Sequence, residues 1–226
     1  MPKTTIVLDI ETVPDEGWTP RQGEHDFAPL PLHVPVSIVA LQLTTHSQQA
    51  SPHLEFYSYL ATSGDEAAYL QGLGERLSAS DRLVTWNGQK FDMPLLGLRA
   101  MKCGVDWSFW VQRRKRYGVG WSLYHHDLKD LLGDYRAHSI TLDTTCTMLG
   151  LKGKGALDGS QVKKVWKEPG GPEKVHTYCH EDVWHTFEVY LWWIQTFYSE
   201  ARPVVPDVRL AARAWAENCP VLARLF

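Results

Sequence analysis

Residues 4–11 read TTIVLDIE, an apolar run that ends in two acidic residues, Asp9 and Glu11. An apolar run of this kind predicts a buried β-strand, here over residues 4–10. Because side chains alternate along a strand, Asp9 and Glu11 leave the same face. Two neighbouring acids repel each other unless a cation lies between them. The stretch therefore predicts a buried strand with a candidate metal site at its end, although an exposed acidic strand end is the simpler interpretation of this tripeptide alone.

A second polar cluster, NGQKFD at residues 87–92, follows the apolar run LVTW at 83–86. The run predicts another buried strand, and Asn87-Gly88 is typical of a turn. Asp92 comes after this turn and begins a predicted helix over 92–103. Taken alone, Asp92 is more simply a helix N-cap than a metal ligand.

A third cluster, YCHED at residues 178–182, lies in the longest helical pattern of the chain, 173–198. Tyr178 and Asp182 are four residues apart and share one face of that helix. The same face is largely apolar, and burying a lone carboxylate is costly, so Asp182 needs a partner there. A metal ion would supply one; the alternative is a surface helix on which Asp182 caps or pairs with a lysine.

The order of the predicted elements favours an α/β fold with a mixed sheet flanked by helices. Three strands come first, and helices and strands then alternate. Polar, glycine-rich or irregular stretches at 12–33, 104–122 and 150–160 are predicted to be loops. No linker interrupts the chain, so residues 1–226 are predicted to form a single domain with a core at about 4–198 and a short C-terminal extension at 199–226. The remaining predicted strands are 34–43, 54–60 and 123–126, and the remaining predicted helices are 65–79, 127–132, 141–149 and 207–217.

Composition sets the class of protein. The chain has 226 residues, 44% of them apolar, and a net charge of −3, so it lacks the overall basic character of many nucleic-acid-binding proteins. Its apolar runs are too short to cross a bilayer, and no signal peptide is expected at its start. The four cysteines are scattered, which favours a reducing, cytoplasmic environment and argues against a zinc site.

Together, the three clusters resemble the three motifs of the DEDD exonucleases, which have the ribonuclease H-like fold with a mixed five-stranded sheet. Tyr178 and Asp182 match the tyrosine subclass; the histidine subclass would have His where this chain has Thr177. The sequence most resembles stand-alone bacterial and phage proteins related to the exonuclease domain of family-B DNA polymerases. The likeness runs from Thr5 to about Tyr198 and includes Phe27-Ala28-Pro29-Leu30, His126-Asp127-Leu128 and Asp158-Gly159-Ser160.

The resemblance implies a 3′–5′ exonuclease that removes nucleotides from the 3′ end of DNA, with single-stranded DNA as the expected partner. It also implies two Mg²⁺ or Mn²⁺ ions as cofactors. Tyr178 would orient the attacking water rather than deprotonate it, because a phenol is a weak base at neutral pH. The expected metal ligands are Asp9, Glu11, Asp92 and Asp182, and the expected contacts to the terminal nucleotide are Thr12, Asn87 and Phe91.

Two further segments are candidate substrate contacts. Basic and aromatic residues alternate within 107–121, including Arg113 and Arg114, and such segments suit a single strand. The alternative is a solvated loop whose tryptophans pack into the core. In the loop 150–160, Lys154 and Asp158 could approach the substrate, or Asp158 could simply cap a helix.

Two other functions remain open from the sequence. An exoribonuclease of the same superfamily would differ by a contact to the 2′-hydroxyl. A catalytically inactive nucleic-acid-binding or scaffolding domain would be expected to have lost one of the four acids, and this chain has all of them.

Overall fold

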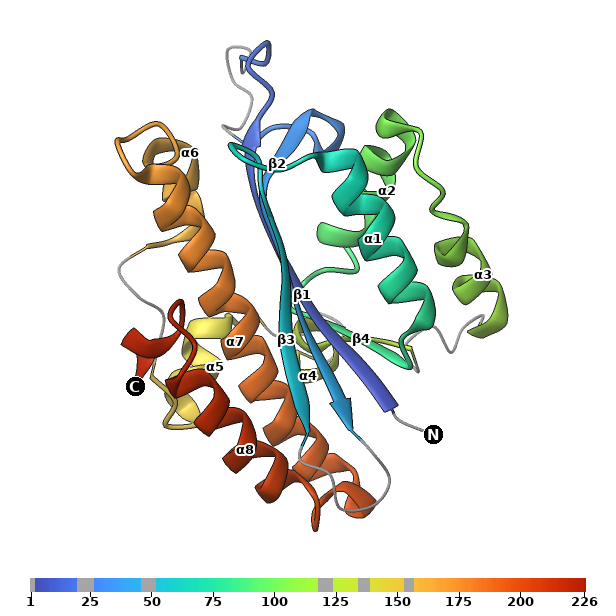
Figure 1. The fold of residues 1–226 in the computed structure, drawn as a ribbon, viewed down its shortest axis with the longest axis vertical. Helices are drawn as coiled ribbons and strands as arrows, with labels where there is room; N and C mark the ends of the chain where they lie inside the picture. The colour runs from blue at the N-terminus through green and yellow to red at the C-terminus, as the bar shows by residue number, and fades with distance from the viewer. Residues whose placement is uncertain (1–2, 20–26, 46–51, 118–123, 134–138, 153–156) are drawn as a thin grey trace.

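The computed structural model describes residues 3–19, 27–45, 52–117, 124–133, 139–152 and 157–226. Its centre is a five-stranded mixed sheet with the strand order β3-β2-β1-β4-β5 (Figure 1). β1 is antiparallel to β2, and β2 is antiparallel to β3, whereas β4 is parallel to both β1 and β5. The predicted mixed sheet is confirmed. The strands are β1 (Lys3–Pro14), β2 (His33–Thr45), β3 (His53–Leu60), β4 (Arg82–Thr85) and β5 (His125–Asp127).

β1 is longer than the sequence predicts. The predicted loop begins at residue 12, but β1 continues to Pro14 because β2 pairs with it as far as His33. β4 pairs only with residues 5–7 of β1, so the far end of β1 has no neighbour on that side in the described chain. A β-bulge interrupts the pairing with β2 between Glu11 and Thr12. Bulges re-aim side chains and are common beside active sites.

Helices cover both faces of the sheet (Figure 1). On one side lie α1 (Glu66–Ala79), α2 (Asp92–Cys103) and α3 (Ser108–Tyr117). On the other side, α7 (Gly171–Phe197) crosses β1 and β2, and α5 (Leu142–Met148) and α8 (Val205–Glu217) pack against it. The short elements are α4 (Leu128–Leu132), α6 (Val162–Val165), η1 (Leu30–Leu32), η3 (Gly159–Gln161), η4 (Ser199–Ala201) and η5 (Ala223–Leu225).

The helix α3 corrects the prediction of an irregular segment at 104–122. Its sequence has little helical periodicity, and its stability comes from tertiary contacts. Phe109 is buried in the apolar cluster to which α1 and α2 also contribute side chains. Arg113 donates hydrogen bonds to the carbonyls of Ser78 and Ser80 at the end of α1 and lies 4.4 Å from the ring centre of Tyr124. Packing of this kind outweighs weak local propensity.

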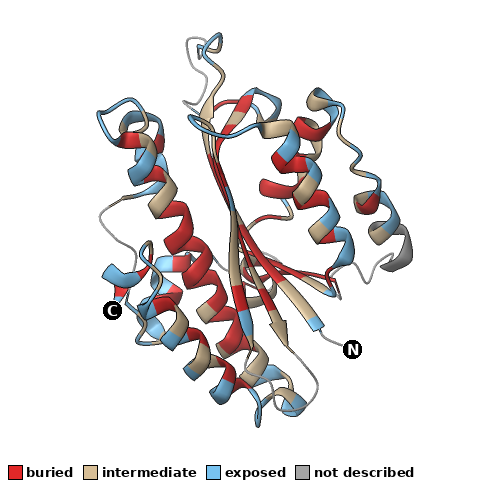
Figure 2. Ribbon diagram, in the orientation of Figure 1, coloured by how far each residue is buried: buried red, intermediate tan, exposed pale blue. Residues whose placement is uncertain are grey.

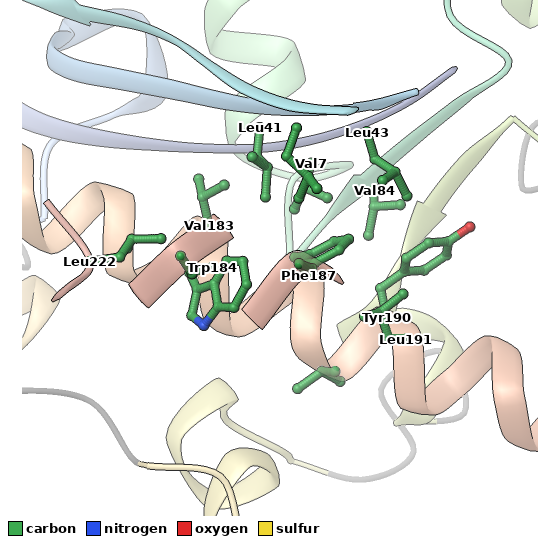
Figure 3. Close-up of a cluster of buried hydrophobic side chains, with 14 of the residues drawn as sticks. Val7, Leu41, Leu43, Val84, Val183, Trp184, Phe187, Tyr190, Leu191 and Leu222 are labelled. Atoms are coloured by element: carbon green, nitrogen blue, oxygen red, sulfur yellow. The ribbon is translucent and has the colours of Figure 1, made fainter. Parts of the chain in front are cut away.

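Each face of the sheet has its own apolar core (Figure 2). Figure 3 shows the cluster between the sheet and α7, where Val7, Leu41 and Val84 face Val183 and Phe187. The C-terminal extension belongs to this cluster, because residues of α8 and η5 are buried in it. Among the described residues, no helix combines the length and apolar character needed to cross a membrane.

Candidate active site

Three of the predicted ligands converge. Asp9 and Glu11 come from β1, and Asp182 comes from α7, which packs across that strand. One carboxylate oxygen from each lies within 4.8 Å of the others. Glu11 is 9% exposed and Asp182 5% exposed, so these charges are concentrated in a poorly solvated region. Such a group of oxygen ligands is suited to a hard divalent cation.

Tyr178 lies one helical turn before Asp182, as predicted, and is buried. Burial raises the pKa of Tyr178 well above its usual value, and the charges of Asp182, Glu11 and Asp9 raise it further. A side-chain hydrogen bond with Asp182 adds to this effect. A carboxylate can only accept, so the phenol O–H donates this hydrogen bond to Asp182. Tyr178 therefore remains neutral, and its oxygen lone pairs can accept a hydrogen bond from another group.

Asp92, the fourth predicted ligand, lies apart from the cluster of three. It is the first residue of α2, whose N-cap is Phe91, so the N-cap interpretation of Asp92 is wrong. Burial raises the pKa of Asp92 to about 8, and the charge of Asp127 also raises it. Hydrogen bonds from its own backbone and from the backbone of Ile10, the residue between Asp9 and Glu11, oppose that shift. Its Oδ1 atom is buried without a hydrogen-bond partner, so a cation would relieve this carboxylate.

The turn before α2 has an unusual conformation. Asn87 has a φ of 71°, in the left-handed region. Asp127 fixes this turn by accepting hydrogen bonds from the backbone N–H groups of Asn87 and Gln89, at 2.8 and 2.9 Å. Asp127 is the N-cap residue of α4, but its side chain makes no cap hydrogen bond. Gly88 is required in this turn, because a Cβ there would lie 2.6 Å from the side chain of Thr85.

Cys179 lies behind Asp9 and was not expected to contribute to the site. Its thiol donates to the backbone carbonyl and to Oδ2 of Asp9, at 3.5 and 3.6 Å. Burial raises the pKa of this thiol, so it remains protonated and can donate. Because the sequence shows only an apolar helix position there, nothing in the local pattern indicates this contact.

A cleft of about 450 Å³ opens beside Glu11. Thr12, Asn87 and Phe91, the residues predicted to contact the terminal nucleotide, all line it. Its other wall is formed by residues from the segment before β2, from η3 and from α6. The remaining lining residues are Ile10, Pro14, Phe27, Ala28, His33, Gly159, Ser160 and Lys163.

Two side chains of the cleft that can hydrogen-bond or carry charge, His33 and Lys163, were missed by the sequence reasoning. His33 falls at the end of a segment predicted to be a loop, three residues after the end of the FAPL stretch that contributes to the resemblance. Lys163 is exposed and lies 5.9 Å from the ring centre of Trp18. The helix that carries Lys163 has four residues, too short for a periodic signal.

The other predicted substrate contacts are not brought to the cleft by any described contact. Arg113 is held at the end of α1, beside the start of β4, whereas the acids lie beyond the end of β4. Asp158 accepts a hydrogen bond from the backbone of Ser160 and caps η3, which confirms its cap interpretation. Lys154 and the side chain of Arg114 lie outside the described residues.

The buried histidines are packed side chains, and none of them belongs to the group of potential metal ligands found among the described residues. His125, His126 and His180 are each at most 3% exposed. Burial lowers the pKa of His125 and of His126 to about 3 and that of His180 to about 4. They are therefore neutral at physiological pH, as expected for packed side chains.

The mixed five-stranded sheet and the carboxylates on β1 and α7 define an exonuclease-like α/β domain. The chain belongs to the family described as "Predicted 3'-5' exonuclease related to the exonuclease domain of PolB", which it matches over residues 25–199. Asp9 and Glu11 precede the matched region, so their place in the site rests on the structure.

The structure is similar to the family B DNA polymerase from the hyperthermophilic archaeon Pyrobaculum calidifontis, with a TM-score of 0.60 and 18% sequence identity. That match covers 100% of this chain and 27% of the polymerase. The fold is therefore shared with part of a much longer protein. A search of curated protein sequences finds no match for this chain.

Proposed function

We propose that this protein is a divalent-metal-dependent 3′–5′ exonuclease that releases nucleotides from the 3′ end of single-stranded DNA. The observation that carries this proposal is the convergence of Asp9, Glu11 and Asp182 within 4.8 Å, beside Tyr178 and a cleft of nucleotide size. The family to which the chain belongs supports the same reaction class.

The acids fit divalent cations by their chemistry. Asp9, Glu11 and Asp182 offer hard oxygen ligands, which Mg²⁺ and Mn²⁺ prefer. Asp92 offers a buried oxygen that has no partner within the protein. Two bound cations would activate a water molecule and stabilise the leaving 3′ oxygen. We assign Asp9 to both ions. We assign Asp92 to the second ion.

The protein's own groups orient the reactants. Tyr178 donates a hydrogen bond to Asp182 and uses its oxygen lone pairs to hold the attacking water. The thiol of Cys179 fixes one carboxylate oxygen of Asp9. Asp127 fixes the turn that carries Asn87 into the cleft. Positioning of this kind lowers the barrier by removing the need to order the reacting groups during the reaction.

The cleft suits the terminal nucleotide of a single strand. Its volume of about 450 Å³ falls within the usual range for small-molecule sites. Phe27 and Phe91 supply ring faces for a base or sugar, and Lys163 supplies positive charge for a phosphate. Local positive charge is needed to bind the phosphates of the strand, because the net charge of the chain is −3. All four cysteines are free, which supports a reducing, cytoplasmic environment.

The test is a cleavage assay on DNA and RNA oligonucleotides of one sequence, each labelled at the 5′ end. We expect stepwise shortening of the DNA with Mg²⁺ or Mn²⁺, and none in excess chelator. Asp9→Asn should abolish it, whereas Asp207→Asn, at an exposed site on α8, should not. Activity that persists in chelator or in Asp9→Asn refutes the metal mechanism. Faster shortening of the RNA would identify an exoribonuclease, and metal-dependent binding without cleavage would identify an inactive binding domain.

A further inference from the structure

His33 makes two hydrogen bonds, and together they fix which way the hydroxyl proton of Thr12 points. Its Nε2 atom lies 2.9 Å from the backbone oxygen of Ala28, and its Nδ1 atom lies 2.8 Å from Oγ1 of Thr12. The ring is 3% exposed. Phe27 and Phe91 hold its orientation, with ring centres 4.6 and 5.2 Å from that of His33. Because the His33 side chain is buried and packed against these two rings, it keeps both hydrogen bonds in place.

The chemistry of these partners decides where the protons lie. A carbonyl oxygen can only accept, so Nε2 of His33 is protonated and donates the hydrogen bond to Ala28. Burial lowers the pKa of His33, which supports the neutral ring. In a neutral imidazole the other nitrogen is an acceptor. The hydroxyl proton of Thr12 is therefore committed to Nδ1 of His33, and its oxygen has only lone pairs left to offer.

We propose that His33 fixes the Thr12 hydroxyl as a hydrogen-bond acceptor, and that this acceptor selects a nucleic-acid end whose terminal sugar carries a free 3′-hydroxyl. The inference rests on the proposed function, since it concerns the same cleft. His33 is a positioning residue that acts through Thr12, and Thr12 is the specificity-determining residue.

The surroundings of Thr12 support this selection. Thr12 lines the cleft next to Glu11. The β-bulge in the pairing of β1 with β2 lies between these two residues. A 3′-hydroxyl can donate to the Thr12 oxygen. A 3′-phosphate at neutral pH has little to donate and places negative charge next to both the Thr12 lone pairs and the Glu11 carboxylate. A site with fixed polarity discriminates strongly against a group that cannot satisfy it.

The test measures binding of three single-stranded DNA oligonucleotides that differ only at the last sugar: 3′-hydroxyl, 3′-deoxy and 3′-phosphate. Fluorescence anisotropy in Ca²⁺ reports binding without relying on turnover. For the wild type, we expect the 3′-hydroxyl end to bind roughly 3- to 10-fold more tightly than the 3′-deoxy end, the value of one neutral hydrogen bond. The 3′-phosphate end should bind more weakly still.

Three variants separate the roles. Thr12→Val keeps the shape but removes the hydroxyl, and it should reduce the preference over 3′-deoxy to less than about 2-fold. Thr12→Ser keeps the hydroxyl and should retain the preference. His33→Phe preserves ring volume but frees the Thr12 proton, so the discrimination against 3′-phosphate should fall by roughly threefold or more. Thermal unfolding establishes that each variant is folded, and Thr12→Val decides the matter if His33→Phe is not.

The outcomes distinguish this inference from the proposed function. If the wild type neither binds nor cuts any of the oligonucleotides, the proposed function fails and the inference fails with it. If it binds or cuts DNA but binds all three ends equally, only the inference is overturned. The same holds if Thr12→Val keeps the full preference for the 3′-hydroxyl.

Discussion

Replacing Asp92 with asparagine should stabilise the metal-free protein while removing a residue that we assign to metal binding. Asp92 is 4% exposed, its Oδ1 has no hydrogen-bond partner, and burial raises its pKa from 3.8 to about 8. The native state therefore takes up a proton at this group at pH 7, whereas the unfolded chain leaves the group ionised. Asparagine has nearly the same shape and needs no such proton.

Proton linkage gives the sign and the size of this effect on the free energy of unfolding. Between pH 3.8 and about 8 the native state binds more protons at Asp92 than the unfolded state does, so stability falls as the pH rises. One pKa unit corresponds to about 1.4 kcal/mol, so the free energy involved is on the order of 5 kcal/mol at pH 8 and about 2 kcal/mol at pH 5. The advantage of Asp92→Asn over the wild type should therefore grow by about 4 kcal/mol between these pH values.

The assay is urea unfolding in chelator at pH 5 and pH 8, with Glu200→Gln as a control at an exposed acid. The control should follow the wild type at both pH values. Added Mn²⁺ should stabilise the wild type at pH 8 more than it stabilises Asp92→Asn, because the ion replaces the proton on the buried carboxylate. A pH-independent difference between Asp92→Asn and the wild type would refute the reasoning, as would equal stabilisation of both by Mn²⁺.

Three further predictions concern the site. Tyr178→Phe should lower turnover by roughly 10²- to 10⁴-fold and leave measurable activity, whereas Asp182→Ala should lose more because it removes a ligand; the opposite order in single-turnover assays would reverse the roles. Lys163→Gln should lower the salt slope of single-strand binding by about 0.7, the value for one phosphate contact, and Lys164→Gln, its exposed neighbour, should not; equal slopes for the two variants would exclude the contact. Asp127→Ala should destabilise the protein by roughly 2–3 kcal/mol in urea unfolding, because two partly buried N–H groups of the turn lose their acceptor; wild-type stability would contradict that role.

Strong local periodicity made most of the fold predictable. Apolar runs identified the strands, and long helices such as α2 and α7 showed a buried face. Thr141 begins α5 with a capping box, a signal that is local to the sequence. By contrast, α3 depends on Arg113 reaching carbonyls 33 and 35 residues away, and no local pattern records such a contact.

The convergence of Asp9, Glu11 and Asp182 could be predicted because each lies at the end of an apolar run or on a helix with a clear pattern. Their neighbours could not. The fold brings Lys163 into the same cleft as Glu11, far from it in the sequence. The role we assign to His33 depends on a hydrogen bond to Thr12, 21 residues away. Asp127 has the position of a helix cap, yet its carboxylate is used by the turn at Asn87. For Asp127 the local pattern offered the helix cap as a partner, and tertiary packing gave its carboxylate to the turn instead.

The unequal lengths of β1 and β4 explain why the site forms where it does. β4 pairs with β1 only over residues 5–7, while β1 continues to Pro14 with β2 as its neighbour. On the β4 side, the backbone beyond residue 7 needs other partners, since buried N–H groups are rarely left unpaired. Asp92 takes one of these positions through its bond with Ile10, and that bond holds α2 against the strand that carries Asp9 and Glu11. The cleft opens along the same overhang. Its lining includes Ile10, Glu11, Thr12 and Pro14, which all lie on that overhang, so the short β4 is as much a part of the site as the acids themselves.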